Sequence, residues 1–163
     1  MEFGLTPESD LFYMGECLEL AQSAAASSEI PVGAILVLRD GEVFKSTNQV
    51  EATGDPTAHA ERLVISSASS RCGRRALIGS TLYVSLEPCP MCAAALVQAR
   101  VGRLCYAARD KRFGGCRSIY RIADDPRMNH RLTITEGILR DESIALLQGF
   151  FEQRRLHSDD QIV

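Results

Sequence analysis

The spacing of apolar residues along the chain predicts helices and strands that alternate. Near the N-terminus, apolar side chains recur every three or four residues, which predicts a helix over residues 7–28 with Thr6 as its N-cap. The unbroken apolar run at 32–38 is typical of a strand that is covered on both faces. An Asp-Gly turn signal at 40–41 then predicts a hairpin that returns along a second strand at 43–48.

The same alternation continues through the middle of the chain. We expect a second helix over residues 58–68, with Thr57 as its N-cap, and a third helix over residues 91–99. Residues that alternate one by one predict strands at 82–86 and at about 132–134, and we expect a further strand at 103–107.

A last helix is predicted near the C-terminus. Asp141 is expected to cap it, and Ile144, Leu147 and Phe151 form the apolar stripe that would face the core. Strands that alternate with helices predict an α/β domain built from stacked layers. Because the hairpin makes two neighbouring strands antiparallel, the five-stranded sheet is expected to be mixed.

Composition and length fit one globular domain. The 163 residues are 45% apolar and 24% charged, close to the average of soluble domains, which excludes a disordered or fibrous chain. The longest apolar run, at 31–38, is far shorter than the ~20 residues of a membrane-spanning helix. The N-terminus shows no basic or apolar leader. We therefore expect a cytoplasmic protein without a membrane partner, with a single domain over residues 1–163.

Charge is distributed unevenly, although the net charge is only −3. Residues 1–30 hold six acids and no base, whereas residues 100–131 hold nine bases and three acids. A basic segment in an otherwise acidic chain can bind a polyanion such as RNA, or it can be a solvated arginine-rich face. Charge alone leaves these two interpretations open.

Two short motifs carry the candidate chemistry. His59 and Glu61 stand at the start of the second predicted helix, and Cys89 and Cys92 form a C-x-x-C pair where a strand leads into the third. One histidine and two cysteines make three zinc ligands, and a catalytic zinc site keeps its fourth position open for water. The dipole at each helix start favours thiolates. Glu61 is then placed to act as the catalytic base.

Each motif also has a simpler interpretation. A lone His-x-Glu is usually a polar first turn, and a lone C-x-x-C can belong to a thiol–disulfide protein or to a zinc-stabilised RNA-binding protein. The thiol–disulfide interpretation gives His59 and Glu61 no role, and a structural zinc site gives Glu61 none. Together, His-x-Glu and Pro-Cys-x-x-Cys make the signature of zinc deaminases that act on nucleobases.

Longer stretches around these motifs resemble the cytidine/deoxycytidylate deaminase superfamily. The likeness extends over about residues 14–155, and three stretches carry it: 29–34, 55–61 and 86–92. Three others look like the branch of the family that edits tRNA: Ala108-Arg109-Asp110, Met128-Asn129-His130-Arg131 and residues 134–139. The resemblance implies a three-layer cytidine-deaminase-like fold in which helices flank a central five-stranded mixed sheet.

The resemblance also implies an activity, a cofactor and partners. The expected reaction is the zinc-dependent hydrolytic deamination of the wobble adenosine in a tRNA anticodon stem-loop, which gives inosine and ammonia. His59, Cys89 and Cys92 would hold one Zn²⁺ per chain, and Glu61 would carry protons between the attacking water and the base. The chain is expected to form a homodimer.

Further positions match substrate-binding residues of the family: Asn48, Ala60, Asp110, Asn129, His130 and Arg131. Asn48 could instead end a strand, and Asp110 could cap a turn. The resemblance gives the basic segment a purpose, so we expect three of its cations on the RNA side: Arg109, Lys111 and Arg112.

The choice of substrate depends on the less common stretches. The zinc motifs also occur in enzymes that deaminate free bases, so guanine or cytosine is the alternative substrate. The arginine-rich segment and Met-Asn-His-Arg favour RNA, because a small-molecule enzyme has little use for them. One departure from the family is Gly115-Cys116-Arg117-Ser118, where a small, glycine-rich run is expected, and Arg117 would either contact a phosphate or face solvent.

Overall fold

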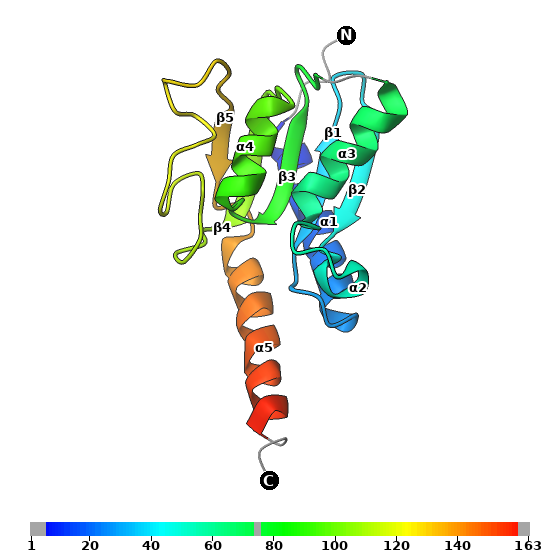
Figure 1. Cartoon of the computed structure of the whole chain (residues 1–163), viewed down its shortest axis with the longest axis vertical. Coiled ribbons are helices and arrows are strands. Elements are labelled where there is room, and N and C mark those ends of the chain that lie inside the picture. The colour runs from blue at the N-terminus through cyan, green and yellow to red at the C-terminus, as the bar shows by residue number, and fades with distance from the viewer. Residues whose placement is uncertain (1–5, 74–75, 160–163) are drawn as a thin grey trace.

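Five strands form one mixed sheet, in a computed structural model that describes residues 6–73 and 76–159. The strands are β1 (Gly33–Val37), β2 (Val43–Thr47), β3 (Thr81–Leu86), β4 (Arg103–Ala108) and β5 (Thr133–Glu136). Their order across the sheet is β2-β1-β3-β4-β5 (Figure 1). β1 pairs antiparallel with β2 and β3, while β4 runs parallel to β3 and β5. The prediction of a mixed sheet is confirmed.

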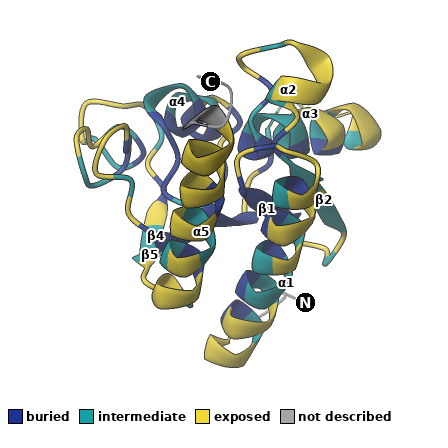
Figure 2. Cartoon of the chain, turned by 90° about the horizontal axis from the view of Figure 1, so that it is seen from below, coloured by how far each residue is buried: buried dark blue, intermediate teal, exposed yellow. Residues whose placement is uncertain are grey.

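Helices cover both faces of the sheet and make it the middle of three layers. α3 (Ala60–Cys72) and α4 (Pro90–Gln98) lie on one face (Figure 1), and α1 (Pro7–Ala26) and α5 (Arg140–Asp159) lie on the other (Figure 2). This is the three-layer α/β fold that the sequence predicts. Among the described residues, no helix combines the length and apolar character needed to cross a bilayer.

The centre of the sheet is buried on both sides, as the unbroken apolar run of β1 predicts. Leu36 belongs to the core beneath α3 and α4, and its neighbour Ile35 belongs to the core beneath α1. Helix α1 approaches β1 so closely that a Cβ on Gly33 would lie 2.3 Å from the carbonyl oxygen of Cys17. Glycine at this position therefore lets the two layers meet.

The start of α1 has the cap that the sequence predicts. The backbone N–H of Ser9 donates to the Thr6 hydroxyl, and the backbone N–H of Thr6 donates to the Ser9 hydroxyl at 2.8 Å. This reciprocal capping box satisfies amides that the first turn of a helix leaves unpaired. Pro7 occupies the first helical position, where its missing N–H costs nothing.

The start of α3 differs from the prediction. His59, not Thr57, is the N-cap, and the helix runs over Ala60–Cys72 until Gly73 ends it in a left-handed conformation. The Oδ1 atom of Asp55 accepts hydrogen bonds from both the backbone N–H and the hydroxyl of Thr57, at 2.8 and 2.7 Å. The threonine is thus engaged in the preceding turn and does not cap the helix.

The last helix is rotated relative to the predicted stripe. α5 begins before Asp141, so this acid lies in the first turn, where its charge still suits the helix dipole. Phe151 is exposed, Phe150 is buried in its place, and the other two stripe residues are partly buried. The hydroxyl of Ser143 donates to the carbonyl oxygen of Ser85, and this buried contact sets the face that α5 turns to the sheet.

Two helix starts meet at one end of the sheet. Leu86 and Ala108, the last residues of the parallel strands β3 and β4, pair with each other. Helix α4 begins soon after β3 with Cys89 as its N-cap, and α3 begins at the same end with His59 as its N-cap (Figure 1). The fold therefore carries both predicted zinc motifs to one place.

Candidate active site

The structure brings the three predicted zinc ligands together. The Nδ1 atom of His59 lies 3.5 Å from the Sγ atoms of both Cys89 and Cys92. The three donor atoms lie within 4.8 Å of one another, a spacing that one metal ion can bridge. Nδ1 is thus the imidazole nitrogen that faces the sulfurs, a choice that the sequence does not reveal.

Hydrogen bonds favour a thiolate at one of the two cysteines, Cys89. A hydrogen bond from Cys92 lowers the pKa of Cys89 to about 4, and His59 adds to this effect. The pKa of Cys92 is raised, because its thiol donates that hydrogen bond and is itself buried. Both thiols lie at the positive end of the α4 dipole. One imidazole nitrogen and two sulfurs suit zinc, and three protein ligands leave a position open.

Glu61 lies beside the cluster in the first turn of α3. Its side chain is only 4% exposed, and burial raises the pKa of the carboxyl to about 7. A carboxyl that titrates near neutral pH can both take up and release a proton. A purely structural metal site needs no such group, so the arrangement suits acid–base chemistry.

Asn48 and Ala60 meet next to His59. Asn48 is buried at the end of β2, and its Oδ1 atom accepts a hydrogen bond of 2.9 Å from the backbone N–H of Ala60. This contact fixes the first turn of α3, which also carries Glu61. Asn48 thus ends a strand and supports the site at the same time.

A short helix that no sequence pattern predicted lies between Asn48 and His59. This helix, α2 (Val50–Thr53), has buried Glu29 at its start, where the carboxylate accepts hydrogen bonds from the backbone N–H groups of Glu51 and Ala52. Such a carboxylate stabilises a helix N-terminus. Glu29 precedes α2 by about twenty residues in the sequence, so the only available signal was its place in the family-like stretch 29–34.

Asp110 begins the loop that follows β4. Its Oδ1 atom accepts hydrogen bonds from the backbone N–H groups of Arg112 and Phe113, at 3.0 and 3.1 Å. Its own N–H donates to Glu87, a buried glutamate for which the only signal in the sequence was its place in the family-like stretch 86–92. Asp110 therefore shapes the turn in which it lies, as its simpler interpretation predicts.

The structure does not bring residues 129–131 to the zinc-ligand cluster. They precede β5, whose first residue, Thr133, pairs with Arg103 at the start of β4, while the cluster lies where β3 and β4 end. The Nε2 atom of His130 donates to the carbonyl oxygen of Val101 at 2.7 Å. Asn129 and Arg131 are exposed. Within one chain, these residues and His59 thus lie at opposite ends of the sheet.

The three cations expected on the RNA side have different surroundings. Arg109 forms a two-pronged ion pair with Glu136 of β5, at 2.6 and 2.8 Å. This guanidinium lowers the pKa of Glu136 to about 2. Lys111 and Arg112 are exposed in the loop after Asp110. They are therefore better placed than Arg109 to offer positive charge to a polyanion.

Comparisons with known proteins agree with this site. The chain matches the family model of the cytidine and deoxycytidylate deaminase zinc-binding region over residues 7–108. It is 42% identical over 145 residues to a tRNA-specific adenosine deaminase of Aquifex aeolicus. The match covers 88% of this chain and 95% of that relative.

Two solved structures share the fold. One, from a study of A-to-I editing by tRNA:A34 deaminases at the wobble position of transfer RNA, gives a TM-score of 0.79 at 42% identity over 83% of this chain and 99% of its own. A guanine deaminase of Nitrosomonas europaea gives a TM-score of 0.74 at 28% identity, and the match covers 90% of this chain and 85% of the other. The family model covers more than half of the chain and includes the cluster and Glu61, so this protein belongs to the cytidine and deoxycytidylate deaminase family.

Proposed function

We propose that this protein is a tRNA adenosine deaminase that converts the wobble adenosine of an anticodon stem-loop to inosine and releases ammonia. The observation that carries the proposal is the buried carboxyl of Glu61 beside the donor atoms of His59, Cys89 and Cys92. The substrate class is supported by the tRNA-specific adenosine deaminase of Aquifex aeolicus, at 42% identity over almost its whole length.

Each residue of the site has a task in this reaction. His59, Cys89 and Cys92 would hold one zinc ion, which when bound would supply the acidity that makes water a nucleophile at neutral pH. Glu61 takes a proton from the attacking water and delivers it to the ring nitrogen of adenine while the oxygen adds to C6. The same carboxyl then takes the proton of the new C6 hydroxyl and passes it to the amine, so that the C6–N bond breaks, a carbonyl forms at C6 and ammonia leaves. An anticodon loop suits this site because its bases are unpaired and cost little to splay out.

Substrate contacts are proposed on two sides of the reacting base. Asn48, Ala60 and Asp110 lie at the end of the sheet where the zinc ligands are, so they can contact the nucleotide bound by their own chain. Residues 129–131 lie at the other end. We propose that they contact a nucleotide held in the second subunit of a homodimer.

Exposed apolar side chains support the homodimer. The loop between β4 and β5 leaves four large apolar side chains between 39% and 58% exposed: Phe113, Ile119, Tyr120 and Met128. Exposed apolar residues concentrated in one segment are typical of a protein interface. We further propose that residues 1–163 form a single deaminase domain and that the enzyme acts in the cytoplasm, where it meets tRNA.

Guanine is the alternative substrate that a specific observation favours. The guanine deaminase of Nitrosomonas europaea matches this fold almost as well as the tRNA-deaminase structure does, although at lower identity. The zinc chemistry would be the same in both, so only the groups that surround the base distinguish them. Exposed cations in the loop after Asp110 favour RNA.

The deciding experiment offers the purified protein an anticodon stem-loop with adenosine at the wobble position. Inosine is detected by mass spectrometry of the nucleosides, and ammonia release is followed in parallel. We expect inosine at the wobble position and none in a matched stem-loop with guanosine there. Free guanine, cytosine and adenosine are tested beside it, and turnover of free bases alone would contradict the tRNA assignment.

A further inference from the structure

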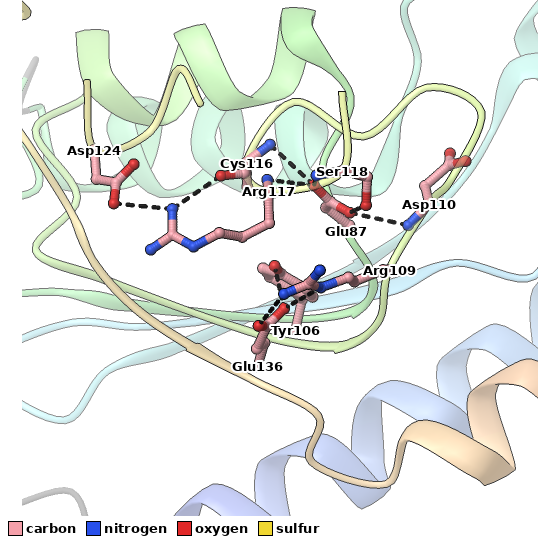
Figure 3. Close-up of polar contacts among 9 residues, drawn as sticks. All are labelled: Glu87, Tyr106, Arg109, Asp110, Cys116, Arg117, Ser118, Asp124 and Glu136. Carbon is pink, nitrogen blue, oxygen red and sulfur yellow. Dashed lines mark hydrogen bonds and ion pairs between the residues drawn. The ribbon is translucent and has the colours of Figure 1, made fainter. Parts of the chain in front are cut away.

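A buried glutamate outside the zinc-ligand cluster organises the loop after β4. Glu87, between the end of β3 and Cys89, is only 2% exposed. One carboxylate oxygen, Oε1, accepts hydrogen bonds from three backbone N–H groups, those of Cys116, Arg117 and Ser118, at 3.1, 2.6 and 2.9 Å (Figure 3). A buried carboxylate is costly unless it is fully hydrogen-bonded, so these contacts hold the loop firmly.

The second oxygen of Glu87 reaches the other end of the same loop. Oε2 accepts a hydrogen bond of 3.0 Å from the backbone N–H of Asp110 and another from the hydroxyl of Ser118. The carboxylate thus accepts five hydrogen bonds in all, which offset the cost of burying its charge. One carboxylate therefore joins the first and last residues of loop 110–118 (Figure 3).

The loop that Glu87 holds rests directly on the turn that carries Cys89. The backbone N–H of Gly115 donates to the carbonyl oxygen of Pro88 at 2.8 Å. A Cβ on Gly115 would lie 2.7 Å from the backbone nitrogen of Pro90, and a Cβ on Gly114 would lie 2.5 Å from the Glu87 carboxylate. The backbones are in contact with no room for a side chain, so the position of the loop is tied to that of the zinc-ligand turn.

Arg117 connects loop 110–118 to the segment that follows it. Its guanidinium pairs with Asp124 at 2.8 Å and donates to the carbonyl oxygen of Cys116 at 2.9 Å (Figure 3). The arginine that departs from the family pattern thus joins loop 110–118 to the chain that follows it. Its charge is engaged within the protein, whereas Lys111 and Arg112 remain exposed in the loop.

We propose that Glu87 is a positioning residue for RNA binding, which holds loop 110–118 and its exposed cations Lys111 and Arg112 in register with the zinc-ligand turn. Glu87 does not touch the substrate; it acts through the loop. The identity of the ligand as RNA rests on the proposed function. The bracing of the loop does not, so the two can be tested separately.

The test compares the wild type with Glu87→Gln and Glu87→Ala. Glutamine keeps one acceptor oxygen and loses the other, whereas alanine loses both. Hydrogen exchange followed by mass spectrometry should show faster exchange in the peptide spanning 110–118 than in the wild type. The increase should be moderate in the glutamine variant and larger in the alanine variant. Exchange around Cys89 and Cys92 should change little. Bound zinc, measured by elemental analysis, should stay near one per chain in Glu87→Gln.

Steady-state kinetics on the anticodon stem-loop separates positioning from general stability. For Glu87→Gln we expect KM to rise about tenfold while kcat changes little, because a charge-assisted hydrogen bond that orders the RNA-binding loop is lost. A merely structural role would instead reduce zinc content, thermal stability and the amount of active enzyme together, at unchanged KM. That pattern, or unchanged exchange in loop 110–118, would overturn the proposal.

Asp10→Asn is the matched control. Asp10 is also a buried carboxylate with several donors, but it belongs to α1 on the other face of the sheet. The control should lose stability without altering loop exchange or KM. If the wild type forms no inosine, the proposed function fails, and the exchange of residues 110–118 in Glu87→Gln still decides whether Glu87 braces the loop.

Discussion

Two buried glutamates near the zinc ligands show how surroundings set the chemistry of one side-chain type. Glu61 is buried with few donors, and its pKa rises to about 7. Glu87 is equally buried but accepts hydrogen bonds from a hydroxyl and several backbone N–H groups, and its pKa stays below the ordinary value. The first can therefore exchange protons at neutral pH, whereas the second remains a fixed anion that holds structure.

Replacement of Glu61 tests the proton-transfer role at this scale. Glu61→Ala should lower kcat on the stem-loop by about 10²–10⁴-fold, the range for loss of a general acid–base group. Zinc content should remain near one per chain, because His59, Cys89 and Cys92 are unchanged. The measurements are inosine formation and elemental analysis, with Glu19→Ala as a control at an exposed glutamate. Activity within a few-fold of wild type would exclude Glu61 as the base.

At the scale of single elements, a buried ion pair fastens α1 to the sheet. Asp10 accepts hydrogen bonds from the hydroxyl of Tyr83 at 2.6 Å and from the guanidinium of Arg103 at 2.8 and 2.7 Å. Arg103 also donates to Thr135 of β5 at 2.9 Å. This ion pair thus links a helix to three adjacent strands, and the loss of the carboxylate would leave the partly buried guanidinium of Arg103 without its opposite charge.

Asp10→Ala should lower the free energy of unfolding by about 2–4 kcal/mol at neutral pH. Burial raises the pKa of Asp10, but the hydrogen bonds from Arg103 and Tyr83 outweigh burial, so the folded pKa lies below the unfolded value. The contribution is complete above the unfolded pKa, about 3.9, and is lost as the pH falls through the folded pKa. Urea unfolding should therefore show that Asp10→Ala has a lower free energy of unfolding than the wild type. The difference should be constant near neutral pH and should become smaller in acid.

Tyr83→Phe provides the companion measurement for this ion pair. It removes one hydroxyl and keeps the pair between Asp10 and Arg103, so its effect should be smaller than that of Asp10→Ala and less dependent on pH. If the loss of unfolding free energy in Asp10→Ala instead grows as the pH falls, the folded pKa of Asp10 does not lie below its unfolded value and the prediction is wrong.

The loop after β4 is a second element whose role can be tested. The double variant Lys111→Glu, Arg112→Glu should weaken stem-loop binding at low salt. The slope of the logarithm of the binding constant against the logarithm of the salt concentration should become shallower by about one to two. Arg71→Glu, an exposed charge reversal at the other end of α3, is the control. Binding is measured by fluorescence anisotropy with a labelled stem-loop at several salt concentrations. Equal affinity for the loop variant and the control would contradict the RNA-binding role.

Local patterns predicted the elements well where one segment decides its own structure. The Thr6 cap, the apolar run of β1 and the two zinc motifs at helix starts are of this kind. The errors had two causes. Thr57 is engaged by Asp55 in a competing local turn and does not cap α3. The distant contact of Ser143 with Ser85 sets the phase of α5, which no local pattern reveals. Distant partners also hid the roles of Glu29, which accepts hydrogen bonds from helix α2, and of Glu87, which accepts them from the loop after β4.

At the scale of the whole molecule, the layered fold separates two groups of proposed substrate residues. Parallel strands bring the zinc ligands to the end of β4 and leave residues 129–131 near its start. A six-residue strand spans about 20 Å, and the sheet lies between these groups. One chain therefore holds Asn129 and Glu61 too far apart for both to contact one nucleotide, which supports the proposal that Asn129 serves the site of a second subunit.

Subunit mixing tests this arrangement directly. Glu61→Ala and Asn129→Ala should each lose most activity as pure homodimers. In a mixed dimer, the chain with intact Glu61 would receive Asn129 from its partner, so one of the two sites is complete. Unfolding and refolding of an equimolar mixture should then restore about a quarter of the wild-type rate, since half of the dimers are mixed. If Asn129 serves its own chain, neither site is repaired, and the mixture stays as inactive as its components.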